Sequence, residues 1–269
     1  MLRGKEIQTI AGRIKVRDIQ IEKDYVISWL LWGIAENETL RENLIFKGGT
    51  VLKKAYFDDY RFSEDLDFTL INPDLSDEVL LNEFNKVIEN IYQTTAIQLK
   101  LSEIERHQSG SVAFYIYYSG PLGGKIEGKS VKIDITRGEK VLYDTLWKEI
   151  LNTYSDKPEF SQTLQCYTLE EVVVEKMVAL MGRTQPRDVY DLWYLLEENH
   201  VEIEFIKAEF EIKAKHKGHN PDDFIKVWDR KTKQFGTLWK QYLTHQIADL
   251  PDYDGVVRAI NRHFRTGLK

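Results

Sequence analysis

The chain has 269 residues, of which 42% are hydrophobic and 30% charged, with six prolines and a formal net charge of −6. This composition excludes a wholly disordered chain, and the negative charge argues against a protein that coats nucleic acid. A single cysteine, Cys166, excludes an internal disulfide and any multi-cysteine metal site.

Two features indicate where the protein acts. The first seventeen residues lack the apolar segment of a signal peptide, and no stretch reaches the roughly 20 apolar residues that span a bilayer. We therefore expect a cytoplasmic protein with no membrane partner.

Residues 201–269 carry a charge of +3 and leave −9 for the rest. This slight bias suits either a surface that meets phosphates or the solvated faces of helices.

The first third of the chain alternates between helical and strand-like patterns of apolar residues. In chain order we expect a helix over 23–36, a strand over 44–46, a helix over 50–56, a strand over 62–71 and a helix over 77–92.

Strand-like segments continue over 97–101, 111–118 and 131–136, and the glycine-rich turn 120–124 predicts a hairpin between the last two. From residue 145 the pattern is mostly helical. Two helices, 169–181 and 187–197, are separated by Gly182 and Pro186. We therefore predict an α+β domain over residues 1–150 and a mostly helical domain over 151–269.

The stretch "FKGGTVLKKAYFDDYRFSEDLDF", residues 46–68, contains the first candidate site. Residues two apart in a strand face the same side, so Ser63, Asp65 and Asp67 share one face. Asp134 stands in the same way between isoleucines of a later strand. If the two strands are neighbours, three carboxylates converge, and oxygen ligands without His or Cys favour Mg²⁺ or Mn²⁺.

The glycine turn before these acids suits a phosphate. Gly48 and Gly49 let the backbone come close to an anion, and the N–H groups of a following helix attract it. Lys47 precedes the glycines, so this is not a Walker A loop. A lone Gly-Gly is usually a turn, and a lone Asp-x-Asp is usually a solvated strand edge. The two in this order, with a third acid later, form a specific pattern.

This pattern resembles a known superfamily. Gly48-Gly49-Thr50, followed after fourteen residues by Asp65-Leu66-Asp67, is similar to the signature of nucleotidyltransferases with the polymerase-beta-like fold. The stretch over 46–68 and a second one, "EVVVEKMVALMGRTQPRDVYDLWYLL" (residues 171–196), resemble more narrowly the AbiEii family, the toxins of abortive-infection toxin–antitoxin pairs. The likeness extends over about residues 20–200.

The resemblance implies a fold, a mixed sheet with flanking helices and a helical C-terminal region, and a reaction, metal-dependent transfer of a nucleoside monophosphate from an NTP. It assigns the metal to three carboxylates and the phosphates to the glycine turn with Ser63. The residues it implies are Asp65, Asp67 and Asp134 as metal ligands, Gly48, Gly49 and Thr50 as the phosphate turn, and Lys176, Arg187, Asp188 and Asp191 as the family's later Lys and Arg-Asp-x-x-Asp elements.

The spacing of the later block agrees with that assignment. Lys176 and Arg183 are seven residues apart and are predicted to share a helix face, and Arg187 and Asp191 are four apart. Cations presented from two apolar helices would suit a triphosphate. The alternative is an ordinary surface ladder of ion pairs.

Our first hypothesis is a nucleotidyltransferase toxin that modifies an RNA, with the acceptor end of tRNA as the expected target, and is restrained by a cognate antitoxin. A second keeps the chemistry but takes a small molecule or a protein side chain as acceptor. A third is a nucleotide-binding module that transfers nothing. Retention of all three acids together with Lys176 disfavours the module.

Overall fold

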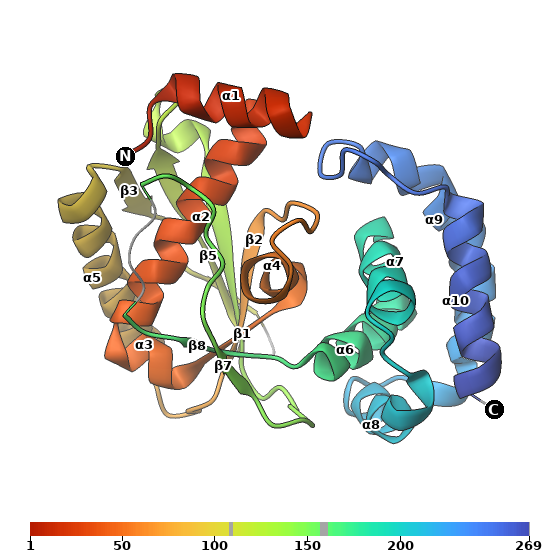
Figure 1. The fold of residues 1–269 in the computed structure, drawn as a ribbon. Helices are drawn as coiled ribbons and strands as arrows, with labels where there is room; N and C mark the ends of the chain where they lie inside the picture. The colour runs from red at the N-terminus through yellow and green to blue at the C-terminus, as the bar shows by residue number, and fades with distance from the viewer. Residues whose placement is uncertain (108–109, 157–160, 269) are drawn as a thin grey trace. The chain divides into compact units, whose positions relative to one another are not determined.

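The computed structural model describes residues 1–107, 110–156 and 161–268, and the chain divides into two compact units. The first unit comprises Met1–Glu139 and Thr145–Cys166, and the second comprises Lys140–Asp144 and Tyr167–Lys269. Figure 1 gives the order of the elements along the chain. No helix in the described part is long and apolar enough to cross a membrane.

The first unit is built on one mixed sheet of eight strands among the described residues. The strands are β1 (Leu44–Lys47), β2 (Asp65–Leu70), β3 (Gln98–Leu101), β4 (Glu105–Arg106), β5 (Val112–Ser119), β6 (Ser130–Thr136), β7 (Leu146–Lys148) and β8 (Leu164–Cys166). Their order is β3-β5-β6-β2-β1-β8-β7, with β4 paired to β5. The pairs β2–β6 and β1–β8 are parallel and the other pairs are antiparallel.

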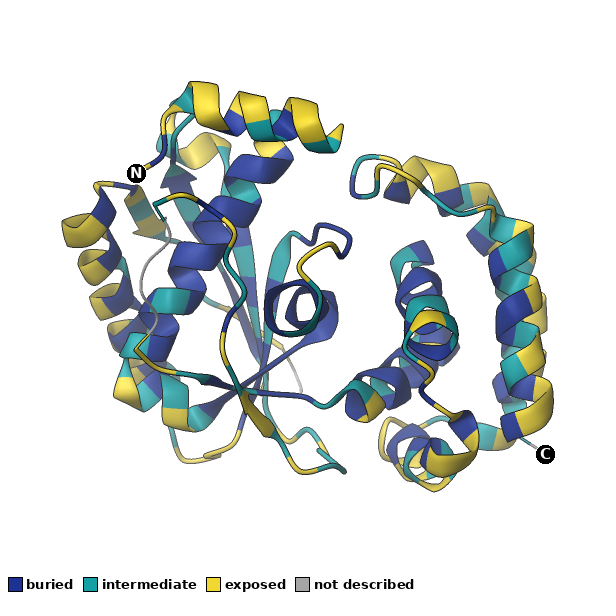
Figure 2. Cartoon of the chain, in the orientation of Figure 1, coloured by how far each residue is buried: buried dark blue, intermediate teal, exposed yellow. Residues whose placement is uncertain are grey.

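Helices pack against this sheet within the first unit. They are α1 (Gly4–Ile14), α2 (Asp18–Glu36), α3 (Glu38–Asn43), α4 (Gly48–Val51), a π-helical turn over Leu52–Tyr56, α5 (Asp77–Thr95) and a 3₁₀ turn over Ile126–Gly128. α2 lies beside α5 in Figure 1, and Figure 2 shows α2 buried along most of its length. Gly33 allows the close approach, because a β-carbon there would meet Val87 Cγ1 at 2.7 Å.

A buried ion pair ties the helical turn after the glycines to α2. Lys54 Nζ lies 2.7 Å from Asp24 Oδ2 and 2.9 Å from Ser28 Oγ, and the Tyr154 hydroxyl donates to the same Asp24 oxygen at 2.8 Å. Burial alone would raise the pKa of Asp24, but attraction to Lys54 and these hydrogen bonds lower it. Asp24 therefore stays ionised, and the pair holds α4 and its π-helical extension in place.

The second unit is helical. It contains α6 (Leu169–Gly182), α7 (Pro186–Trp193), a π-helical turn over Tyr194–Glu198, α8 (Ile203–His216), a 3₁₀ turn over Pro221–Asp223, α9 (Phe224–Leu243) and α10 (Tyr253–Gly267). Within this unit α6 packs on α7 and α8, and α7 packs on α9. Glu171 on α6 is buried, pairs with Lys213 of α8, and accepts the backbone N–H groups of Leu142 and Tyr143. This carboxylate thereby fixes the segment 140–144 to α6.

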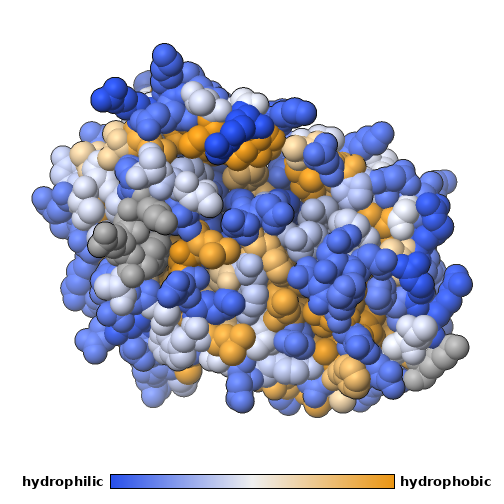
Figure 3. Space-filling model, viewed as in Figure 1, coloured by the Kyte–Doolittle hydropathy of each residue, from blue (hydrophilic) through white to orange (hydrophobic). Residues whose placement is uncertain are grey.

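Polar residues predominate on the face shown in Figure 3, and apolar areas lie between them. Some large apolar side chains are well exposed, notably Phe205 and Ile212 on α8. Single exposed apolar side chains are common on protein surfaces, so these alone define no site.

The structure confirms the predicted fold class, including the hairpin, because β5 and β6 pair antiparallel. The predicted elements are present with small shifts at their ends, of which the largest is the start of α2 at Asp18. The mostly helical pattern expected from residue 145 was wrong for two short strands, β7 and β8. Each has three residues, too few for an alternating pattern to stand out.

Candidate active site

The sheet brings the predicted carboxylates of the first unit to one face. Asp65 and Asp67 are half-buried, whereas Leu66 and Phe68 between and after them are fully buried. β2 and β6 are parallel neighbours, and Asp67 pairs directly with Asp134. Alternation in a strand therefore places all three acids on the same side, as the sequence predicted.

Gly48 lies in contact with one of these acids. It has a φ of +77°, which an L side chain rarely adopts, and a β-carbon there would stand 2.2 Å from Asp67 Oδ2. The glycine is required on both counts, for its backbone conformation and for the space that the carboxylate fills. The glycine turn and the first acidic pair thus form one local structure.

Thr50 connects the same two segments. Its hydroxyl donates to the backbone carbonyl of Asp65, the first residue of β2. Lys53 in the next turn donates to the carbonyls of Asp58 and Tyr60 at 3.1 Å each, and so shapes the loop before the strand. Ser63 is buried but precedes β2 rather than lying on it. A phosphate-binding role for Thr50 and Ser63 stays a prediction.

A lysine that the sequence analysis did not single out lies among the acids. Lys132 is the register partner of Asp65, and its Nζ is 2.9 Å from Asp134 Oδ2. Partial burial lowers the pKa of Lys132, but the hydrogen bond and attraction to Asp134, with a contribution from Asp65, raise it overall. The sequence already indicated this position, because Lys132 precedes Asp134 by two residues and so faces the same side of the strand.

The site also has a second cation at its edge. Lys47, which ends β1, is the register partner of Asp67, and its Nζ lies 3.6 Å from Glu139 Oε2. Both side chains are nearly inaccessible to solvent. The polar face of the sheet therefore crosses three strands, from Lys47 through Asp67 to Asp134.

These residues fit a hard divalent cation in their donor type. Carboxylate oxygens without His or Cys are the ligands that Mg²⁺ and Mn²⁺ prefer. In the described residues, no three His, Cys, Asp or Glu side chains are gathered tightly enough to enclose an ion. Asp134 instead engages Lys132. Metal ligation by Asp65, Asp67 and Asp134 stays a prediction, as does phosphate binding at Gly49.

Four of the residues predicted in the later block form a cluster within the second unit: Lys176, Arg183, Asp188 and Asp191. Lys176 Nζ lies 2.9 Å from Asp188 Oδ1 and 2.8 Å from Asp191 Oδ2, and both carboxylates are fully buried. Arg183 holds Asp188 with two hydrogen bonds, from Nε at 2.8 Å and from Nη2 at 3.0 Å. Two cations and two carboxylates thus pair in one network.

The cluster differs from the prediction in two respects. Arg183 lies just beyond the end of α6, with extended backbone, rather than on the helix face that Lys176 occupies. Asp188, to which the sequence analysis gave no role beyond its motif, contacts both Lys176 and Arg183. Burial would raise the pKa of Asp188, but Lys176 and Arg183 lower it. The roles predicted for Lys176, Arg183, Arg187 and Asp191 toward a nucleotide stay predictions.

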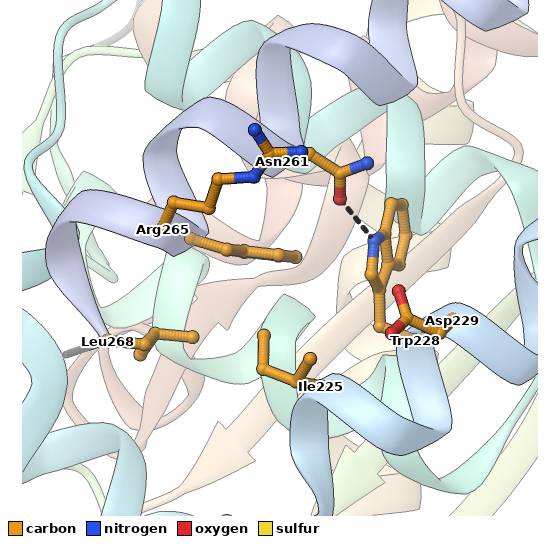
Figure 4. Close-up of a pocket in the computed structure, with 7 residues that line it drawn as sticks. Ile225, Trp228, Asp229, Asn261, Arg265 and Leu268 are labelled. Atoms are coloured by element: carbon orange, nitrogen blue, oxygen red, sulfur yellow. Dashed lines mark hydrogen bonds between the residues drawn. The ribbon is translucent and has the colours of Figure 1, made fainter.

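A pocket of about 360 Å³ lies between α9 and α10 (Figure 4). Apolar side chains form much of its lining, and Asp229, Asn261 and Arg265 add polar groups. Trp228 Nε1 donates to Asn261 Oδ1 at 2.8 Å. None of the predicted site residues lines this pocket.

Comparison with solved structures identifies the fold. MenT4, a nucleotidyltransferase toxin from Mycobacterium tuberculosis H37Rv, is similar with a TM-score of 0.71 and 18% identity, over 98% of this chain and 89% of that one. JHP933 from Helicobacter pylori is similar with a TM-score of 0.56 and 16% identity, over 93% of this chain and 92% of that one. At these identities the likeness shows the fold, which is that of a nucleotidyltransferase.

The sequence identifies the family. Residues 29–266 match the model of the nucleotidyl transferase AbiEii toxin family, type IV toxin–antitoxin system. The chain therefore belongs to the AbiEii family and is a nucleotidyltransferase. The comparison with curated proteins gives no match. The resemblance found in the residues over 46–68 and 171–196 is confirmed, and it extends well beyond residue 200.

Proposed function

We propose that this protein transfers a nucleoside monophosphate from an NTP to RNA, with tRNA as the expected acceptor, and that a divalent cation is required. The observation that carries the proposal is the register of β2 and β6, which sets Asp67 beside Asp134, with Asp65 on the same face. Carboxylates on one face of neighbouring strands repel one another, and a cation between them would reduce that repulsion.

Asp65, Asp67 and Asp134 would hold Mg²⁺ or Mn²⁺ at the polar face of the sheet. The bound ion would neutralise charge on the triphosphate and on the leaving pyrophosphate. Gly48 keeps Asp67 in place by leaving room for its carboxylate. Thr50 fixes the start of β2 through the Asp65 carbonyl. Asp134 is the carboxylate that would accept the proton of the attacking hydroxyl.

The biological role follows from the family. AbiEii proteins are the toxins of type IV toxin–antitoxin systems, so an antitoxin is the expected partner. We place the reaction in the cytoplasm, where NTPs, Mg²⁺ and tRNA are available. MenT4, whose fold this chain shares, is itself described as a nucleotidyltransferase toxin, which supports the same reaction class.

The experiment that tests this function separates the possible acceptors. The protein is incubated with Mg²⁺ and each of the four α-labelled NTPs, together with total RNA, with total protein, or with a small-molecule extract. We expect label in the RNA fraction, concentrated in tRNA and dependent on one or two of the NTPs. Label only in protein or small molecules would replace the RNA acceptor, and no label with any fraction would contradict transfer.

A further inference from the structure

Lys132 lies inside the row of carboxylates rather than at its border. On β6 it shares the face of Asp134, and across the parallel pair it is the register partner of Asp65. Its ammonium is 2.9 Å from Asp134 Oδ2, and both side chains are 30% exposed. A positive charge belonging to the protein therefore already occupies one side of the acid that would complete a metal site.

The neighbouring strands β5 and β1 determine which other charges lie beside the pair of Lys132 and Asp134. On β5 the register partner of Lys132 is Tyr115 and that of Asp134 is Ala113, so β5 adds no full charge there. On the other side β1 places Lys47 next to Asp67, and the ammonium of Lys47 lies near Glu139. The contact between Lys132 and Asp134 joins a cation of the protein directly to a predicted ligand carboxylate.

We propose that Lys132 is a positioning residue that competes with a divalent cation for Asp134. Without the cation, its ammonium holds Asp134 and offsets the repulsion among the three acids. A free divalent cation must then displace this contact and approach a positive charge. Both effects weaken the binding of the free cation. A cation that arrives with a triphosphate brings negative charge with it, and Lys132 disfavours that complex much less. Lys132 thus tunes the site to accept the cation together with the nucleotide.

This inference rests on the proposed function, because it assumes that the carboxylates bind a metal. The proposed effect is electrostatic, so a substitution that removes the charge of Lys132 tests it. Replacing Lys132 by Met should tighten the binding of Mn²⁺ alone on the order of tenfold, since a unit charge within several ångströms of the ion is lost. The binding of Mn²⁺ with a non-hydrolysable NTP analogue should tighten far less. Lys132→Arg keeps the charge and should keep the wild-type affinity for Mn²⁺.

The test is a calorimetric or paramagnetic titration with Mn²⁺ in the absence of nucleotide. Lys100→Met is the matched control, because Lys100 pairs with Glu127 on the surface of the same unit at 3.1 Å and its loss removes the same charge. Lys132→Gln accompanies Lys132→Met in case the latter folds poorly. Tighter Mn²⁺ binding in the neutral Lys132 variants, and not in Lys100→Met, is the expected result.

An affinity in the neutral Lys132 variants equal to that of wild type and Lys100→Met would overturn the competition. An equal gain in Lys100→Met would also overturn it, by showing a general charge effect. Asp67→Asn separates the two proposals. If Mn²⁺ affinity is the same in wild type and Asp67→Asn, the metal site itself is misassigned. If Asp67→Asn loses the ion but the Lys132 variants are unchanged, the role of Lys132 alone fails.

Discussion

The Asp67 carboxylate lies directly against Gly48, so that a β-carbon on Gly48 would stand 2.2 Å from Asp67 Oδ2. The glycine turn and the acidic strand are therefore one unit of structure. A change at one necessarily moves the other, which makes the pair a sensitive place to test the site.

Gly48→Ala should displace Asp67 and strain the backbone at a φ of +77°. We expect a loss of stability of roughly 1–3 kcal/mol from the strain and the contact. The rise in melting temperature on adding Mg²⁺ with an NTP should disappear. Differential scanning fluorimetry with and without metal–NTP measures both effects.

The control for this substitution is Gly128→Ala, because Gly128 has no atom within 4 Å of the added carbon. It should keep both the stability and the response to metal–NTP. A full metal–NTP response in Gly48→Ala would show that the position of Asp67 does not matter for binding.

Thr50→Val tests the structural role of the Thr50 hydroxyl, which is distinct from its predicted role in phosphate binding. The structure uses it to hold the Asp65 carbonyl, so we expect a loss of about 1 kcal/mol of unfolding free energy from the missing hydrogen bond. Thr50→Ser retains the hydroxyl and should stay close to wild type. Urea unfolding measures this, and equal stability of the Val and Ser variants would contradict a structural hydrogen bond.

Lys176→Met should be strongly destabilising, whatever Lys176 contributes to nucleotide binding. The substitution leaves Asp188 and Asp191 buried without the ammonium that lies within 2.9 Å of both. Removal of one partner from such a buried network costs about 3–5 kcal/mol. Unfolding free energies measure the effect.

Lys226→Met is the control, because Lys226 is exposed and its pair with Asp223 lies on the surface of the same unit. It should change stability by less than about 0.5 kcal/mol. A Lys176→Met protein as stable as this control would mean that the cluster is dispensable for folding. Loss of activity in Lys176→Met could then be assigned to nucleotide binding.

Asp188 should make the stability of the protein depend on pH. Its pKa is lowered below the ordinary value of 3.8 by Lys176 and Arg183, which outweigh burial. A carboxyl with a lowered folded pKa adds stability that is fully present above its unfolded pKa and is lost as the pH falls through the folded pKa. The difference in unfolding free energy between wild type and Asp188→Asn should therefore be large near pH 7 and shrink below about pH 4.

The comparison with Asp223→Asn checks that this pH dependence belongs to Asp188. Asp223 is on the surface, so its replacement should leave the loss of unfolding free energy at acidic pH unchanged. If the gap between wild type and Asp188→Asn is the same at about pH 7 and about pH 3, Asp188 does not gain its stabilising effect from ionisation.

Much of the site in the first unit was predictable because a strand has an exact period of two. Alternation placed Asp65 and Asp67 on one face and set Asp134 between Ile133 and Ile135, both of which are buried. The same rule points to Lys132, yet a strand pattern cannot tell which polar neighbour a carboxylate will choose. That choice depends on the register of β2 against β6.

The later block, residues 171–196, shows what the spacing of residues along a helix could not predict. The run Val172–Val174 with Met177 makes α6 apolar on most sides, which already indicates a buried helix. In such a helix a lysine needs an anion of the protein itself, and Asp188 and Asp191 provide two. Sequence spacing suggested ligand contacts for Lys176 but could not show how its charge is matched within the fold.

Whether the acidic face of the sheet catalyses nucleotide transfer is measured most directly by the single-turnover rate of label transfer from an α-labelled NTP to RNA, compared between wild type and Asp65→Asn. The substitution keeps the shape of the side chain and leaves the backbone carbonyl that Thr50 binds. Circular dichroism and melting temperature establish that both proteins are folded. We expect a fall in rate of at least 100-fold, about 3 kcal/mol of lost transition-state stabilisation. A folded Asp65→Asn protein that transfers label at the wild-type rate would contradict catalysis by this face of the sheet.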